Sequence, residues 1–390
     1  MYIKKPVFSL LIILSTYTFG YSQLKQEVPK LLSDMNIQIE ATQAVNDLYN
    51  FKFDRAEKQF RWLKQKYQWH PLPYFLLGLS EWWKIMPNTE ETRYDEKFLA
   101  YMDSSIYLAE RLYEMDETNV EAAFFLSAAY GFKGRLYSDR KSWGKAASAG
   151  KSSLKFLDKS KGQDDLSPEF LFGDALYNYY SVWVPENYPL LRPILMFFSK
   201  GDKNLGIQQL REVANNAFYT RTEAQNFLMR IMAIEENDPL SALPLSEYLA
   251  TTFPDNAYFE RFYARLLYSA GRQRQTELVS LDILDKIDRG MPGYEATSGR
   301  YAAFYLGQIY ESSRDFENAK KYYKRAVDFG EEIEAHESGY YLYSLLALAK
   351  IADKEKDKST ARGYFNQLKS HAKRKHPAHK AARDYLKAKR

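Results

Sequence analysis

The chain has 390 residues, of which 45% are hydrophobic and 27% are charged, a composition that supplies enough apolar material for a core and excludes an intrinsically disordered chain. It contains no cysteine, which excludes disulfide frameworks, thiolate metal sites, cysteine nucleophiles and a cysteine-linked lipoprotein anchor. The formal net charge of +5 is uneven, because residues 369–390 carry nine Lys or Arg and one Asp, which leaves the remainder mildly acidic.

The first 22 residues have the three-part layout of a secretory signal peptide. Lys4 and Lys5 precede an apolar run over residues 7–14, and Gly20 and Ser22 supply the small residues of a cleavage site. The apolar run is shorter than the roughly 20 residues of a membrane-spanning helix, which is the alternative interpretation. We therefore expect residues 1–22 to be removed and the mature protein to be soluble, without a transmembrane segment, in the periplasm or outside the cell.

After a linker expected over residues 23–37, apolar and small residues recur at the spacing of helical hairpins. Residues 53–60 have the form of the second helix of a hairpin, and Tyr74, Leu77 and Gly78 have the spacing of a first helix. Turn signals at Gly and Pro residues separate further hairpins, which pair residues 119–136 with 139–157, 168–184 with 202–217, 220–236 with 239–253, and 256–271 with 273–288. The pattern predicts an all-α chain.

One hairpin is interrupted by prolines. Pro185, Pro189 and Pro193 fall within nine residues, and such a cluster ends a helix and favours an extended connection. We therefore predict a proline-rich insertion near residues 185–200. Residues from about 170 to 210 resemble the TPR family of the mitochondrial outer membrane that is linked to inclusion-body clearance, and no function is transferred from that likeness. The residues that carry it are Phe172-Gly173, Asn178, Val184-Pro185, Gly201-Asp202 and Gly206-Ile207.

The clearest hairpin lies over residues 301–326. Six of its residues fall at the mutual spacings of the tetratricopeptide (TPR) signature, namely Leu306, Gly307, Tyr310, Ala319, Tyr323 and Ala326. Small residues at two of these positions allow two helices to cross closely, and the tyrosines fill the space where a hairpin meets its neighbour.

With these residues the chain resembles the TPR superfamily over most of residues 38–375. The resemblance implies a single domain that is a right-handed superhelix of about eight helical hairpins, an α-solenoid, with a protein-binding role. Residues 376–390 are expected to form a basic capping helix or a tail that could contact an anionic surface.

Motifs for catalysis and metal binding are incomplete. His336-Glu337 begins like the helix of a zinc protease, but Tyr340 stands where the second His is required. Asp353, Glu355 and Asp357 begin like a calcium loop, but Lys358 occupies the position of the required Gly. We therefore expect no catalytic residue, no cofactor and no metal site, and we interpret the tail histidines as solvated: His371, His376 and His379.

Aromatic clusters are the best candidates for a ligand surface. Rings of this kind more often pack in a core, but as a set they are suited to binding a peptide. The candidate groove residues are Trp82, Trp83, Tyr179, Trp183, Tyr301, Phe304 and Gln308.

The leading functional hypothesis is a non-catalytic scaffold or adaptor that binds a protein or peptide partner in the cell envelope. The alternative is a periplasmic component that binds a small ligand for a transporter near Tyr179 and Trp183, with the proline-rich segment as a lid. Export argues against a nucleic-acid partner.

Overall fold

The computed structural model describes residues 29–163, 165–189, 192 and 199–388. Within these ranges the chain forms seventeen α-helices and no strand, which confirms the all-α prediction. The expected signal peptide, residues 23–28 of the expected linker and Pro193 lie outside the described residues.

The first helices are α1 (Met35–Tyr49), α2 (Phe53–Lys66), α3 (Pro71–Ile85), α4 (Asp95–Met115), α5 (Val120–Asp139), α6 (Trp143–Ser160) and, after the short helix η1 (Pro168–Phe170), α7 (Leu171–Asn187). They are followed by α9 (Lys203–Asn216), α10 (Arg221–Arg230), which continues into the π-helical turn η3 (Ile231–Glu235), α11 (Pro239–Thr252), α12 (Ala257–Ser269) and α13 (Gln273–Asp288). The last are α14 (Ala296–Ser312), α15 (Phe316–Glu332), α16 (Gly339–Lys354), α17 (Lys358–His371) and α18 (Pro377–Ala388).

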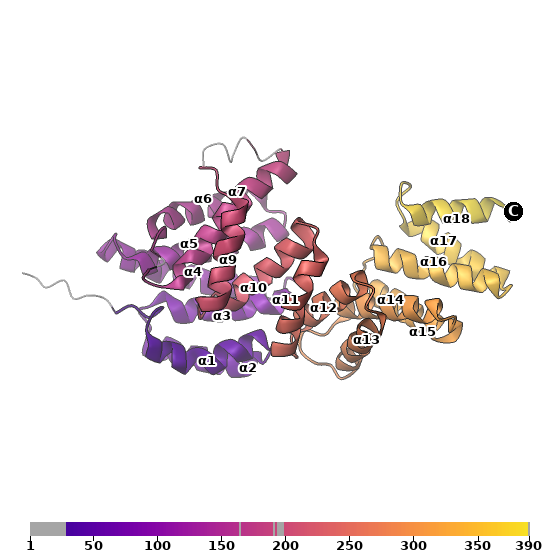
Figure 1. Ribbon diagram of the computed structural model, residues 1–390, viewed down its shortest axis with the longest axis horizontal. Helices are drawn as coiled ribbons and strands as arrows, with labels where there is room; N and C mark the ends of the chain where they lie inside the picture. The colour runs from indigo at the N-terminus through magenta and orange to yellow at the C-terminus, as the bar shows by residue number, and fades with distance from the viewer. Residues whose placement is uncertain (1–28, 164, 190–191, 193–198, 389–390) are drawn as a thin grey trace, which may run out of the picture. The chain divides into compact units, whose positions relative to one another are not determined.

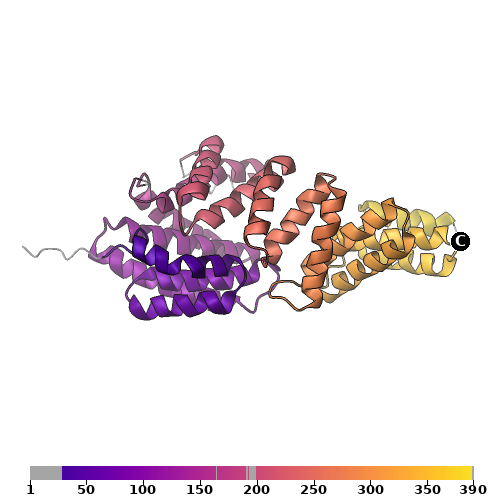
Figure 2. The same cartoon turned by 60° about the horizontal axis from the view of Figure 1, so that its bottom comes forward.

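The helices pack mainly on their neighbours in sequence, as Figure 1 and Figure 2 show. The closest partners include α5 with α6, α7 with α9 and α14 with α15. This arrangement is consistent with an α-solenoid, in which each helical pair buries its apolar face against the next. None of the described helices combines the length and the apolar character that crossing a bilayer requires.

Side-chain caps explain where many helices begin. Asp34, Asn119, Asp202, Asn256 and Asp315 each accept a hydrogen bond from a backbone N–H in the first turn of the helix that follows. These N–H groups have no partner inside their own helix, so a capping oxygen stabilises the helix end. The caps are short-range signals, and the predicted hairpin limits follow them closely.

The helix before the proline-rich segment continues past its first proline. Pro185 lies inside the last turn of α7, which ends at Asn187. A proline near the end of a helix removes one N–H donor, and here two further residues remain helical.

Of the six residues with the TPR spacing, three lie on α14 and three lie on α15. A Cβ placed on Gly307 would lie 2.5 Å from the ring of Tyr323, so only glycine permits this approach. The Tyr323 hydroxyl donates to Glu311 over 2.7 Å, and the ring of Tyr310 stacks on Tyr322 with centroids 5.4 Å apart. The remaining three are fully buried: Leu306, Ala319 and Ala326.

Helices far apart in the sequence also contact one another. Trp83 Nε1 donates to a Glu223 carboxylate oxygen over 2.7 Å, which joins α3 to α10. Asn256 Nδ2 donates to the carbonyl of Tyr49 over 2.7 Å, and Arg261 Nη1 donates to the carbonyl of Pro87 over 2.7 Å. The ends of α1 and α3 are therefore covered by α10 and α12.

Candidate functional site

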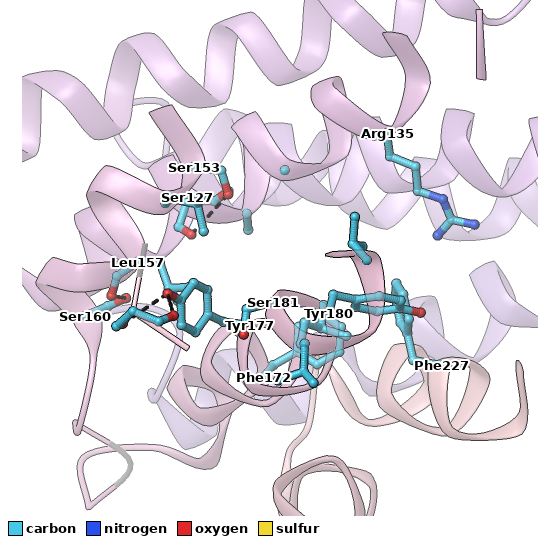
Figure 3. A pocket seen from close by; sticks show the side chains of 18 of the residues that line it. Ser127, Arg135, Ser153, Leu157, Ser160, Phe172, Tyr177, Tyr180, Ser181 and Phe227 are labelled. Carbon is cyan, nitrogen blue, oxygen red and sulfur yellow. Dashed lines mark hydrogen bonds between the residues drawn. The ribbon is translucent and has the colours of Figure 1, made fainter. Parts of the chain in front are cut away.

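A cavity of about 750 Å³ lies between α5, α6 and α7 (Figure 3). Its volume falls within the range of about 300–1,000 Å³ that is usual for small-molecule sites. The wall is mainly apolar and aromatic, with Phe124, Ala128 and Phe132 from α5, Leu154 and Leu157 from α6, Phe170 from η1, Phe172 and Leu176 from α7, and Phe227 from α10.

Small residues on α5 explain why space remains here. Ser127, Ala128 and Gly131 line the cavity from one face of α5, since residues three or four apart share a face. Their side chains are too short to reach α7. Opposite them, the Ser153 hydroxyl of α6 donates to the carbonyl of Ser127 over 2.8 Å, which holds α6 against α5 and leaves the space toward α7 open.

Arg135 lies at one end of the cavity wall, with its guanidinium between two aromatic rings. The guanidinium carbon is 4.7 Å from the ring centroid of Trp82 and 5.6 Å from that of Phe227. Its nearest polar contact is the weak acceptor Sδ of Met86, 4.0 Å from Nη2. Burial, with a further contribution from the positive charge of Arg230, lowers the pKa of Arg135, although an arginine remains protonated in proteins.

The acidic groups on this side of the cavity have partners of their own. Glu223 accepts from Trp83 Nε1 and, over 3.3 Å, from the Tyr49 hydroxyl, and burial raises the pKa of Glu223. Glu235 accepts from the Tyr180 hydroxyl over 2.9 Å, and burial likewise raises its pKa. The charge of Arg135 is therefore not neutralised by direct contact with either carboxyl group.

Two polar side chains elsewhere on the wall also have partners. Ser181 Oγ accepts from the backbone N–H of Gly201 over 3.0 Å, and Arg192 Nε donates to the carbonyl of Pro185 over 2.8 Å. These bonds tie the residues around the proline-rich segment to α7.

The predicted groove residues Trp82 and Trp83 lie in the core. Trp82 is 1% exposed and packs on Phe98 and Phe132, and Trp83 is 0% exposed and packs on Phe259 with ring centroids 5.2 Å apart. Because α4 and α5 cover Trp82 and α10 and α12 cover Trp83, neither ring presents a surface to a partner.

The predicted pair on α7 lies close to the cavity but not in its wall. Tyr179 is fully buried and its hydroxyl donates to Glu236 over 2.5 Å, whereas Trp183 is half-buried and packs on Tyr180 and Tyr188. The residues of α7 that line the cavity include adjacent pairs that recur every fourth position: Phe172-Gly173, Leu176-Tyr177, Tyr180-Ser181 and Val184-Pro185. That period could have identified the cavity-facing side, and the aromatic clusters alone did not.

The predicted residues on α14 divide between core and surface. Phe304 is buried, while Tyr301 and Gln308 are half-buried. Tyr301 packs on Tyr340 of α16 with centroids 4.6 Å apart, and the Gln308 amide donates to the Tyr323 hydroxyl.

Beside them lies an arginine with few partners. Arg300 is 8% exposed, and its Nε and Nη1 have no hydrogen-bond partner among the described residues. Burial lowers the pKa of Arg300. Four half-exposed residues surround it, namely Arg265 of α12, Tyr301 and Gln308 of α14 and Tyr340 of α16, and we call these residues, with the buried Arg300, the tyrosine–arginine face.

Comparisons with known proteins add no assignment. The chain matches no protein-family model, and no curated protein is significantly similar to it. In the described part of the chain, no three His, Asp or Glu side chains are grouped so that they could hold a metal ion. The cavity and the tyrosine–arginine face are thus the features on which a functional proposal can rest.

Proposed function

We propose that the protein is an exported, non-catalytic binding protein of the TPR type, and that the cavity between α5, α6 and α7 receives a small ligand with a large apolar part. The observation that carries the proposal is the cavity itself, with its volume of about 750 Å³ and its aromatic wall. Ligand sites of this size are mostly lined by apolar and aromatic side chains with a few polar groups.

Energetics favour a ligand over an empty space. A ligand that removes apolar surface from water here gains roughly 25 cal/mol per Å². The small residues on α5 therefore leave room for a ligand that withdraws the apolar wall from water.

A variant that fills the cavity tests this proposal. Gly131 lies within α5, and a Cβ there would meet only Ser153 Oγ, at 3.3 Å, so a longer side chain would enter the cavity. Gly131→Leu should weaken binding of the neutral fluorescent probe N-phenyl-1-naphthylamine about tenfold or more, while a gain of about 1 kcal/mol in helix propensity offsets any strain. Fluorescence titration and thermal unfolding measure the two effects.

Gly363→Leu is the matched control. Gly363 lies in α17, where an added Cβ meets nothing within 4 Å. The control should gain stability and bind the probe as the unmodified protein does. Absence of probe binding in the unmodified protein, or equal binding by Gly131→Leu, would contradict the proposal.

The TPR assignment rests on the residue spacing in α14 and α15 and on the order of the helices. The described helices can be grouped into eight successive pairs, from α1 with α2 to α16 with α17, and this grouping supports about eight repeats. The right-handed superhelix is what the TPR resemblance implies. In this proposal residues 38–375 form the repeat domain, α18 caps the last pair, and residues 1–22 direct export.

A second candidate function is binding of a protein or peptide partner in the cell envelope. It is favoured by the tyrosine–arginine face, where the Arg265 side chain and the rings of Tyr301 and Tyr340 are half-exposed. An acidic peptide segment complements such a face, since arginine pairs readily with carboxylates and stacks on rings.

Substitution of Arg265 tests the second candidate. Arg265→Met should weaken binding of a glutamate-rich peptide about tenfold in fluorescence anisotropy, because it removes a cation that can pair with a carboxylate. Arg272→Met, at an exposed position next to the same helix, should leave binding unchanged. Equal affinity for a peptide with Gln in place of Glu would argue against the candidate.

A further inference from the structure

Arg135 occupies the cavity face of α5. Ala128, Gly131 and Arg135 are spaced three and four residues apart and all line the cavity, so they share one side of the helix. Figure 3 shows Arg135 and Phe227 toward one end of the cavity, and Leu157 and Ser160 toward the other. The lining is mainly apolar, and its charged residues are Arg135, Glu186, Arg192 and Lys200, of which Arg135 lies at the end near Phe227.

Arg135 lacks the carboxylate partner that two nearby cations have. Lys133 pairs with Asp103, and Arg140 forms a two-pronged pair with Asp95, with N···O distances of 2.6 and 2.7 Å. Among the described residues no carboxylate oxygen lies within 4.0 Å of the Arg135 guanidinium. Arg135 is half-buried, and a cation that is partly withdrawn from water is costly unless an anion or hydrogen-bond acceptor faces it.

Aromatic rings compensate this cost only in part. Trp82 and Phe227 face the guanidinium at 4.7 and 5.6 Å, and such contacts stabilise a cation while leaving its N–H donors unsatisfied. Arg230 brings a second positive charge that acts on Arg135. The planar guanidinium is thus held in place by stacking and retains the donors that match a carboxylate.

We infer that the ligand of the cavity is an anionic amphiphile, whose carboxylate binds Arg135 and whose apolar chain lies along α5 and α7. This inference rests on the proposed ligand-binding function and adds the chemical class of the ligand. Ser127 and Arg135 are eight residues apart on α5, which corresponds to roughly 12 Å of helix and sets the scale of the apolar chain. A charge-assisted hydrogen bond is about twice as strong as a neutral one, so the head group contributes selectivity as well as affinity.

The test compares two ligands that differ only in the head group. Decanoate and 1-decanol compete with N-phenyl-1-naphthylamine for the unmodified full-length protein at about pH 7.5, where the carboxylate is ionised. Decanoate should bind about tenfold more tightly than decanol. Arg135→Met keeps the length and the apolar contacts of the side chain, and it should abolish this preference, so that decanoate and decanol bind with equal affinity.

Further variants separate charge from structure. Arg135→Lys retains the charge but not the planar fork, so it should keep part of the preference for decanoate. Arg211→Met, at an exposed position on α9, should keep all of it. Thermal unfolding of each variant checks that the fold is retained, and Arg135→Met should be no less stable than the unmodified protein because an unpaired charge is removed.

The outcomes distinguish the two proposals. If neither the probe nor decanol binds the unmodified protein, the proposed function fails and the inference fails with it. If both bind and Gly131→Leu prevents binding, but decanoate binds no more tightly than decanol or Arg135→Met keeps the preference, the inference is overturned while the cavity remains a ligand site.

Discussion

Replacing Glu169 with Ala is expected to lower the free energy of unfolding by at least about 3 kcal/mol. Glu169 is 1% exposed, and its two carboxylate oxygens accept from three consecutive backbone N–H groups, those of Phe218, Tyr219 and Thr220, over 2.6–2.9 Å. The Thr220 hydroxyl adds a fourth bond of 2.6 Å. Each buried donor that loses its acceptor costs about 1–3 kcal/mol.

The effect should extend beyond the substituted residue. The four bonds hold the turn that leads into α10, which carries Phe227 of the cavity wall and Glu223, the acceptor for Trp83. Urea unfolding followed by circular dichroism measures the loss. The urea midpoint of Glu169→Gln should fall between those of Glu169→Ala and the unmodified protein, since Gln keeps one acceptor oxygen. Glu212→Ala, at an exposed position of α9, is the control. A midpoint for Glu169→Ala equal to that of the control would contradict the prediction.

Gly206→Ala should be destabilising even though alanine is the better helix former. A Cβ on Gly206 would lie 2.7 Å from the backbone nitrogen of Tyr179 and 2.8 Å from the carbonyl oxygen of Ala175. Backbone atoms cannot move aside alone, so α9 would have to shift away from α7. Such overpacking costs about 1–3 kcal/mol, which outweighs the gain of about 1 kcal/mol in helix propensity.

A Gly→Ala substitution at a helical position with no close neighbour is the control. Gly363→Ala should raise the urea midpoint, because an added methyl group there meets no neighbour. Since α7 forms one wall of the cavity, Gly206→Ala should also weaken binding of N-phenyl-1-naphthylamine. A rise in midpoint for Gly206→Ala like that of the control would show that α7 and α9 are less closely packed than described.

The positions of the helices followed from short-range features of the chain. Residues 256–271 and 273–288 were predicted as a hairpin, and α12 and α13 occupy Ala257–Ser269 and Gln273–Asp288. Caps such as Asn256 and the period of apolar residues act within a few residues of one another, so they are readable without knowledge of the rest of the molecule.

Which face of a helix is exposed could not be predicted in the same way. Trp82 and Trp83 follow Gly78 at spacings that suggested an open groove, yet both are buried. The residues that cover Trp83, Glu223 and Phe259, are 140 and more positions away in the chain. Contacts at such separation depend on how many helical pairs precede them and at what angle each packs, which the local pattern does not contain.

The amino-acid sequence alone thus determined the helical class of this chain, most of its helix limits and the close crossing at Gly307, because periodicity, caps and residue size act locally. Only the tertiary structure decided that Phe172, Leu176 and Tyr180 face a cavity and that Arg135 lies at its end without a carboxylate in contact. The physical reason is that the size of a cavity depends on how several helices pack together. Whether a charge is paired depends likewise on where other helices place their acidic side chains.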